Sequence, residues 1–353
     1  MRSKTFLIAV ITLSGIFCFE FPLYAQSTAP LTFHLNNSPK DSVRNNSFSE
    51  ESPNGSTNQH ESSRNVLSEN NIYHPSIDDG TVWRVHSDIN KTRLYGFFGT
   101  LAVFDIVGYF RLKELQYDAP TSNFHFTDFS DDLRKNKQMD KYGHIFDGYF
   151  SSHFASKAYR WSGLSAKKSI IYGSVTGWLL FLQVEMADAF FDAWGFSTGD
   201  LIGNTIGVGF SALQQLYPKP LQGVRLKISY QPSEAHKQGL YSAVSSSKLD
   251  DYEGRTHWLS FTIYDFLPEK WQSGYPGWLK PLALTVGQSV NGIALDVWGG
   301  EREIFIGLDI DLNKIPTGRN SFLKILKDEL NLIRLPLPAV RMTPRGTWYG
   351  FYF

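Results

Sequence analysis

The segment Asp140-Lys141-Tyr142-Gly143-His144 places a carboxylate and an imidazole one helical turn apart in a stretch that otherwise reads as a helix. Two further segments, Glu185-Met186-Ala187-Asp188 and residues 194–204 (WGFSTGDLIGN), interrupt apolar helical sequence with acids and an amide. An ionised carboxylate is costly to bury unless it is paired, hydrogen-bonded or bound to a metal. We therefore predict that the three segments converge in one shared polar site.

Four helices are predicted around these segments, over residues 91–115, 140–159, 166–194 and 197–217. Ser197 is a favourable N-cap with Asp200 three residues later, an arrangement that resembles a capping box. The second helix also carries a stripe of small side chains, which lets a partner helix approach closely. The stripe comprises His144, Gly148, Ser152 and Ala155.

The apolar character of these helices leaves two environments open. The uncharged runs at 169–184 and 201–217 fall just short of the ~18–20 apolar residues that a membrane span needs. They are therefore either buried helices of a water-facing bundle or helices partly sunk in a bilayer. The aromatic content of 15% favours membrane association, because so apolar a bundle would otherwise expose large apolar patches to water.

Beyond Pro220 the hydrophobic period changes from that of helices to that of strands. Strands are predicted over residues 226–230, 258–263, 282–290, 304–312 and 348–353, with a short amphipathic helix at 321–332. The aromatic C-terminal segment resembles the last strand of an outer-membrane barrel, but about five or six strands are fewer than the roughly eight that such a barrel requires. We therefore predict an α+β fold, in which a four-helix, membrane-associated bundle (residues 80–217) precedes a small antiparallel β-rich region (residues 218–353).

The N-terminal part of the chain indicates export. Residues 1–25 read as a secretory signal peptide, and residues 26–79, rich in Ser, Asn, Pro and Glu, as a disordered leader. The sole cysteine, Cys18, lies in the signal segment, and the Phe17 before it is too large for a lipid-attachment site. We expect a protein of the bacterial cell envelope, periplasmic or membrane-associated, without disulfides or an attached lipid.

Charge and motifs exclude several classes of function. Lys+Arg and Asp+Glu each number 34, so the chain lacks the basic balance typical of nucleic-acid binding. The sequence contains no P-loop, dinucleotide fingerprint, nucleophile elbow, H-E-x-x-H motif or paired-cysteine motif.

Asp140, His144, Glu185 and Asp188 are the candidates for catalysis. Asp140 either orients His144, binds a metal together with it, or merely stabilises the start of its helix while His144 is a core residue. Glu185 and Asp188 would repel each other on an apolar helix face unless a cation, a proton or a hydrogen-bond donor lies between them. The alternative is that both acids simply lie on a solvated helix face. The pattern E-x-x-D loosely resembles the E-x-x-H of carboxylate metal bundles, so Glu185, Asp188 and His144 are also candidate ligands of a divalent cation.

Asp200, Asn204 and Ser197 are candidates for ligand binding. Asp200 and Asn204 repeat the one-turn spacing of Asp140 and His144. An amide in an apolar helix needs a hydrogen-bond partner, and we expect Asn204 to find it in Glu185 or His144.

Together these motifs resemble a known family. D-K-x-x-H with its aromatic continuation (140–149), E-x-x-D (185–188) and W-G-F-S-x-x-D-x-x-x-N-x-x-G (194–207) are similar to the bacterial predicted periplasmic lipoproteins of unknown function. The strand-rich tail, with Trp258-Leu259-Ser260 and the segment 307–312, looks like an extended version of that family. A more distant likeness is to VanZ-like membrane proteins. The resemblance implies an envelope location and a shared polar site, not a particular reaction.

The sequence thus favours an exported envelope protein with a binding or structural role at the membrane surface, whose partner is a membrane lipid or another envelope component. The alternative is a hydrolase or transferase acting on an envelope lipid or cell-wall intermediate, with His144 as general base or with a divalent cation as cofactor. The sequence leaves open whether the protein is an enzyme and which oligomeric state it adopts.

Overall fold

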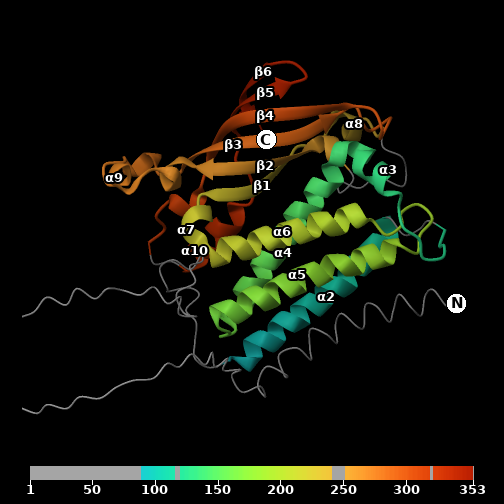
Figure 1. Cartoon of the computed structure of the whole chain (residues 1–353), viewed down its shortest axis with the longest axis horizontal. Helices are drawn as coiled ribbons and strands as arrows, with labels where there is room; N and C mark the ends of the chain where they lie inside the picture. Colours follow the sequence, from blue (N-terminus) through green and yellow to red (C-terminus); the bar gives the residue numbers. More distant parts are fainter. Residues whose placement is uncertain (1–88, 116–119, 241–250, 319–320, 353) are drawn as a thin grey trace, which may run out of the picture.

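The computed structural model describes residues 89–115, 120–240, 251–318 and 321–352. The predicted signal peptide and leader lie outside the described residues. The remainder is an α+β fold, as predicted, with a layer of long helices beside one antiparallel sheet (Figure 1). The long helices are α2 (Lys91–Leu115), α4 (Met139–Trp161), α5 (Ala166–Asp188) and α6 (Thr198–Leu216). The shorter helices are α3 (Phe129–Arg134), α7 (Pro218–Leu221), α8 (Glu234–Lys237), α9 (Glu269–Gln272) and α10 (Ser321–Leu330).

Helix α4 lies between α5 and α6, and small residues bring the three helices together. A Cβ on Gly207 of α6 would lie 2.0 Å from the carbonyl oxygen of Ile145 in α4. A Cβ on Gly148 of α4 would likewise lie 2.6 Å from the carbonyl oxygen of Asn204 in α6. On the α5 side, a Cβ on Gly177 would lie 2.7 Å from the backbone nitrogen of Ser152. The small-residue stripe predicted from the sequence therefore faces both partner helices.

Helix α2 packs on this core through apolar side chains of its first half. Leu94, Phe97 and Phe98 are buried against Ala158 and Tyr159 of α4. Farther along α2, Val103, Phe104, Ile106, Val107 and Phe110 are exposed. Asp105 among them accepts a hydrogen bond from Gln183 of α5 at 3.0 Å. One helix of the described part of the chain, α5, is long and apolar enough to cross a membrane, by length and composition alone.

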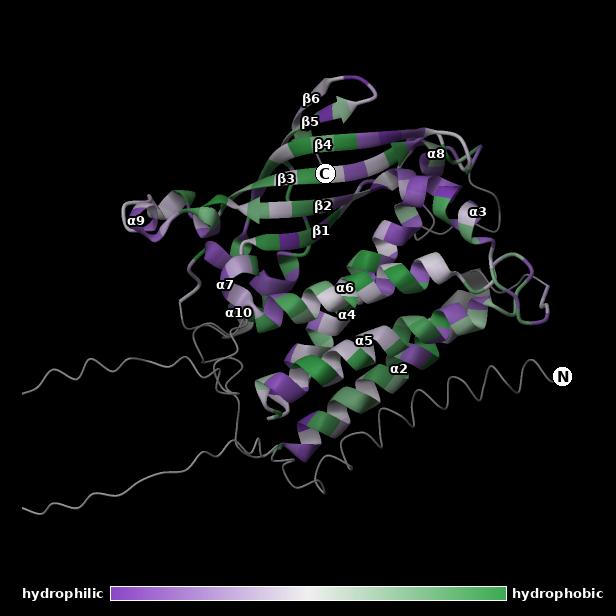
Figure 2. Ribbon diagram, in the orientation of Figure 1, coloured by the Kyte–Doolittle hydropathy of each residue, from purple (hydrophilic) through white to green (hydrophobic). Residues whose placement is uncertain are grey.

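The sheet contains six antiparallel strands in sequence order. They are β1 (Val224–Tyr230), β2 (Arg255–Thr262), β3 (Leu282–Asn291), β4 (Glu301–Ile310), β5 (Leu337–Thr343) and β6 (Thr347–Tyr352). Its buried side holds large aromatic side chains next to polar groups: Trp258 packs on Phe305, and Lys227 pairs with Asp309 at 2.8 Å. The other side carries exposed aliphatic side chains, among them Leu284, Val286 and Ile306. Figure 2 shows hydrophobic stretches along the strands.

Three details differ from the sequence-based prediction. Helix α5 ends at Asp188 rather than near Trp194, because the chain turns there: Gly195, at φ +103°, donates its N–H to the Asp188 carbonyl. Asp192 accordingly lies exposed in this turn and not on a helix face. Strand β5 and helix α3 were not predicted; β5 contains Pro338, and α3 is only six residues long.

We expect Gly207→Ala to lower the free energy of unfolding by about 2–3 kcal/mol, because the new methyl group meets the backbone of α4 and forces the helices apart. Gly209 on the same helix is the matched control, since a Cβ there meets nothing within 4 Å. Gly209→Ala should raise stability by about 0.5–1 kcal/mol through helix propensity alone. Urea denaturation of both variants measures the difference, and equal effects would contradict the packing argument.

Candidate functional site

Lys141 is the centre of the polar site. Its ammonium group donates hydrogen bonds to Asp132 Oδ1 at 2.6 Å, Asp140 Oδ2 at 2.9 Å and Asp200 Oδ1 at 2.8 Å. The lysine side chain is buried, and so are the three acids to a large extent. The neighbouring acids raise the pKa of Lys141 above its usual value against the opposing effect of burial, so the side chain stays charged.

Asp132 reaches Lys141 from a segment that precedes α4. It lies in α3, whose N-cap Asp128 accepts a hydrogen bond from the Asp131 N–H. Between α3 and α4 the consecutive residues Asn136, Lys137 and Gln138 all adopt positive φ, so the chain reverses within a few residues. This reversal brings Asp132 back beside Asp140, and Asp132 Oδ2 accepts a hydrogen bond from Ser197 Oγ at 2.8 Å.

Glu185 completes the N-terminal cap of α6. Ser197 Oγ accepts the Asp200 N–H at 2.9 Å, as the predicted cap requires. In a capping box the acid three residues later would accept the N–H of the cap residue. Here Glu185 Oε2, from α5, accepts the Ser197 N–H at 3.2 Å instead, and the Asp200 carboxylate turns to Lys141. The end of α5 is thereby fixed to the start of α6.

His144 lies between these acids and Asn204. Its Nδ1 is 3.2 Å from Asn204 Oδ1, as expected for that amide. Because an amide oxygen only accepts, Nδ1 carries the proton and Nε2 presents its lone pair when the ring is neutral. Nε2 faces Asp200 Oδ1 at 3.5 Å and Glu185 Oε1 at 4.0 Å. A lone pair facing two carboxylate oxygens is repulsive unless a proton or a cation lies between them.

The site contains more acidic side chains than basic ones. Asp132, Asp140, Glu185 and Asp200 face one ammonium group, that of Lys141, and one imidazole. Burial raises the pKa of Glu185 to about 9, with further increases from the charges of Asp200 and Asp188. Burial also raises the pKa of Asp140 above its usual value. The site therefore favours the uptake of positive charge.

Two groups of ligand atoms in the described part of the chain lie close enough to share one ion. Asp132, Asp140 and Asp200 form the first, but the Lys141 ammonium already occupies the space between them. His144, Glu185 and Asp200 form the second, with one atom from each within 4.8 Å of the others. Imidazole nitrogen and carboxylate oxygens suit zinc, manganese and similar ions. Asn204 then holds the imidazole through its other nitrogen, as partners of metal-binding histidines commonly do.

Two buried polar atoms of the site have no hydrogen-bond partner in the protein, Asp140 Oδ1 and Asn204 Nδ2. Buried polar groups without partners are uncommon in folded proteins and often mark a bound water or ion. Both atoms belong to residues that contact Lys141 or His144.

Of the seven residues predicted from the sequence, six lie together here: Asp140, His144, Glu185, Ser197, Asp200 and Asn204. Asp188 is close enough to raise the pKa of Glu185, but it lies in the last turn of α5 and belongs to neither ligand group. Lys141 and Asp132 were missed. Lys141 is part of the D-K-x-x-H motif. A lysine between the predicted acids could have been predicted as their ion-pair partner.

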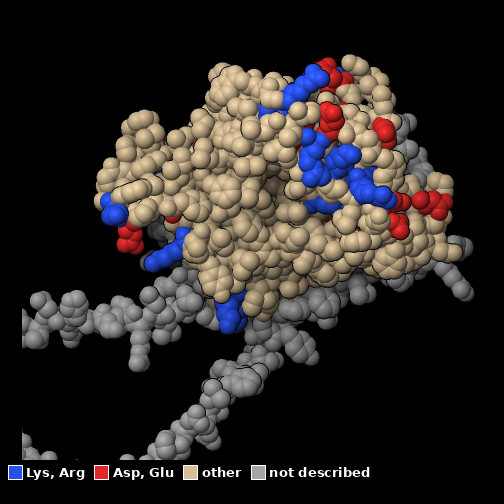
Figure 3. Space-filling view, turned by 45° about the horizontal axis from the view of Figure 1, so that its top comes forward, with Lys and Arg blue, Asp and Glu red and all other residues tan. Residues whose placement is uncertain are grey.

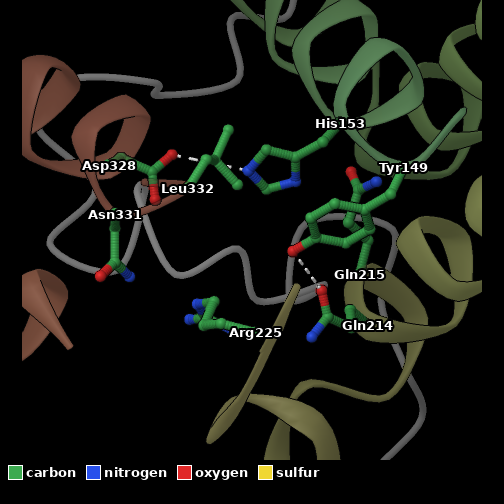
Figure 4. A pocket seen from close by; sticks show the side chains of 8 residues that line it. All are labelled: Tyr149, His153, Gln214, Gln215, Arg225, Asp328, Asn331 and Leu332. Atoms are coloured by element: carbon green, nitrogen blue, oxygen red, sulfur yellow. Dashed lines mark hydrogen bonds and ion pairs between the residues drawn. The ribbon is translucent and has the colours of Figure 1, made fainter. Parts of the chain in front are cut away.

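A second polar cluster lies at the other half of α4, where the helices meet the sheet. Lys157 pairs with Asp328 and Glu329 of α10, and His153 Nε2 is 3.5 Å from Asp328. Here a cavity of about 10 Å³ has room for roughly one water molecule. Figure 4 shows its lining, in which the Arg225 guanidinium of β1 points between the helices. The lining residues are Tyr149, His153, Gln214, Gln215, Arg225, Asp328, Asn331 and Leu332. Such a volume excludes an organic ligand.

Comparison with known proteins supports the resemblance seen in the motifs. Residues 128–216, from α3 to the end of α6, match the family described as Predicted periplasmic lipoprotein (DUF2279). This segment has the pattern of that family. The chain is therefore an exported protein of the cell envelope, and all residues of the Lys141 site lie within the match. The sheet lies outside it, and no curated protein or solved structure matches the chain. The absence of an attached lipid at Cys18 stays a prediction.

We expect Lys141→Met to lower the free energy of unfolding by about 3–5 kcal/mol, because it leaves three largely buried aspartates without their common partner. Lys237→Met is the matched control. Lys237 pairs with Glu234 on the surface of α8, and its removal should change stability by less than about 0.5 kcal/mol. Chemical denaturation measures both, and a Lys141→Met protein as stable as the control would contradict the central role of Lys141.

Proposed function

We propose that this envelope protein binds a divalent cation at the helical core, with His144, Glu185 and Asp200 as its protein ligands. The observation that carries the proposal is the position of His144 Nε2, which faces two carboxylates while Nδ1 is engaged by Asn204. A cation would remove the repulsion among these three groups and offset the excess of acids around Lys141. The proposed role is ligand binding in the envelope.

The orientation of His144 supports binding more than covalent catalysis. A general base for a nucleophile would direct its free nitrogen at a hydroxyl or thiol. Nε2 is instead directed at Asp200 and Glu185. A hydrolase or transferase activity would require the cation itself to take part in the reaction. This alternative therefore depends on the same three ligands.

Glu185→Gln gives the sharpest test, because glutamine keeps an oxygen that can accept the Ser197 N–H. A carboxyl group whose pKa is raised on folding stabilises the folded state only while it is protonated. The cation-free protein should therefore lose stability as the pH rises from about 4.5 to about 9. At pH 8 we expect Glu185→Gln to be more stable than the wild type by about 2–4 kcal/mol, at roughly 1.4 kcal/mol per pKa unit.

Adding Mn²⁺ or Zn²⁺ should reverse this order. The wild type gains stability from binding, whereas Glu185→Gln lacks a ligand and should gain little. Thermal unfolding at pH 6 and pH 8, with the ion and with a chelator, gives the four values needed for each protein. A wild-type melting temperature that no divalent cation changes would refute the proposed cation site.

His144→Ala should weaken cation binding at least about tenfold, as loss of one of three protein ligands implies. In chelator the variant should unfold close to the wild type, since the half-buried ring makes one side-chain hydrogen bond. His236→Ala in α8 is the matched control and should bind as the wild type does. Calorimetry measures affinity, and complementation of a deletion strain tests whether the ligand matters in the cell.

A further inference from the structure

The outward side of the sheet is apolar and exposed over its middle. At the end next to α4 the same side carries His257, Gln288 and Val290, which are buried. One row of side chains in cross-strand register consists of Leu226, Leu259, Val286, Ile306, Val340 and Trp348. A second row, one pleat away, consists of Phe261, Leu284 and Leu308. The central members of both rows are well exposed, with Leu284 at 49%, Val286 at 46% and Ile306 at 47%. We call these two rows the apolar sheet face.

The side chains that alternate with those of the rows point inward. Most of them are polar, and they lie beside the aromatic pair Trp258 and Phe305. Lys227 pairs with Asp309, and Ser260 Oγ donates to the same carboxylate at 2.6 Å. Thr262 Oγ1 donates to Asp311 at 2.9 Å. An antiparallel sheet with one side in water normally buries its apolar side chains and exposes its polar ones. This sheet exposes aliphatic side chains and buries many polar ones beside its aromatic core, an alternation that strands facing lipid also show.

Exposed tryptophans lie beyond both ends of the central strands. Trp271 and Trp278 belong to the connection between β2 and β3, and Trp298 belongs to the β3–β4 hairpin at the opposite end. All three are at least half exposed. Tryptophan is enriched where a protein meets the two polar boundaries of a bilayer.

Charged groups are absent from both rows and gather at the margin. In Figure 3 most of the visible face carries no charge. Most Lys, Arg, Asp and Glu side chains gather on the right, and a few more lie at the left and lower edges. Arg255 and Arg302 stand at the ends of β2 and β4, away from the rows. A protein partner would need hydrogen bonds to fix its orientation, about one per 100–200 Å² of interface. The rows offer aliphatic and aromatic groups alone, which suits a fluid apolar phase.

We propose that the apolar sheet face docks onto the surface of a lipid bilayer and inserts its aliphatic rows among the acyl chains. The tryptophans at the two ends lie at the polar boundary of the lipid. Docking rests on the sheet and not on the cation site, so either proposal can fail without the other.

Labelling with a polarity-sensitive dye tests the contact directly. Cys18 is the sole cysteine, so a Cys18→Ser background accepts one new cysteine in the full chain. The fluorescence emission of a dye attached to Leu284→Cys should shift to shorter wavelength and become more intense when phosphatidylethanolamine–phosphatidylglycerol vesicles are added. The dye on Glu234→Cys, at an exposed polar position of α8, should not respond. A response at Leu284→Cys that follows protein concentration without vesicles identifies a second copy of the chain as the occupant and overturns the proposal.

Vesicle flotation of charge variants supplies a second measurement. Val286→Lys combined with Ile306→Lys should weaken partitioning by about a hundredfold, roughly tenfold for each apolar side chain kept in water. Ile171→Lys combined with Ile206→Lys is the matched control, with similarly exposed side chains on α5 and α6. The control should partition within about threefold of the wild type. Docking through the sheet is refuted if the sheet variant and the wild type float equally, or if only the control loses vesicle binding. If the sheet variant does not fold, the dye at position 284 decides.

Discussion

The ion pairs of Lys141 are the interaction on which the arrangement of the helices depends. One buried ammonium group joins carboxylates from α3, from α4 itself and from α6. Removing any buried charge leaves its partners uncompensated, so the three acids and the lysine are stable only as a unit. The same contacts bring the start of α6 beside the end of α5, where Glu185 accepts the Ser197 N–H. His144 is one turn from Lys141 and is therefore held facing Glu185 and Asp200.

Helix α4 carries two polar clusters, and their charge balance differs. Around Lys157 the charges compensate one another: Lys157 and Arg225 face Asp328 and Glu329, and the cavity between them is of water size. Such a cluster fastens the helices to α10 and β1. Around Lys141 acids outnumber bases. A buried cluster whose charges are not compensated lowers the stability of the fold. Proteins keep such destabilising clusters mainly at functional sites.

The sequence predicted much of the helical site because turn spacing places side chains on a common face. Asp140 with His144 and Asp200 with Asn204 were found in this way, as was the Ser197 cap. Asp132 could not be found, because it reaches the site through three consecutive residues of positive φ, which local propensity does not foresee for Asn, Lys and Gln. The end of α5 was placed too late, since the turn at Gly195 depends on contacts with Asp188. In the sheet, alternation located every strand except β5, but it could not tell which side is buried, because a period of two fits both sides.

The left-handed turn at residues 136–138 links the site to the sheet. The Asn136 N–H donates to the Val297 carbonyl at 2.8 Å, and Lys137 Nζ donates to the Trp298 carbonyl at 3.2 Å, both in the β3–β4 hairpin. Non-glycine residues of positive φ persist only where surrounding contacts fix them. Here the hairpin holds one side of the turn, while Asp132 and Asp140 on either side of it are held by Lys141. The distance between the Lys141 site and the tryptophan end of the hairpin is therefore fixed by the fold. A bilayer bound to the apolar sheet face would hold the acidic site at a constant height above the lipid.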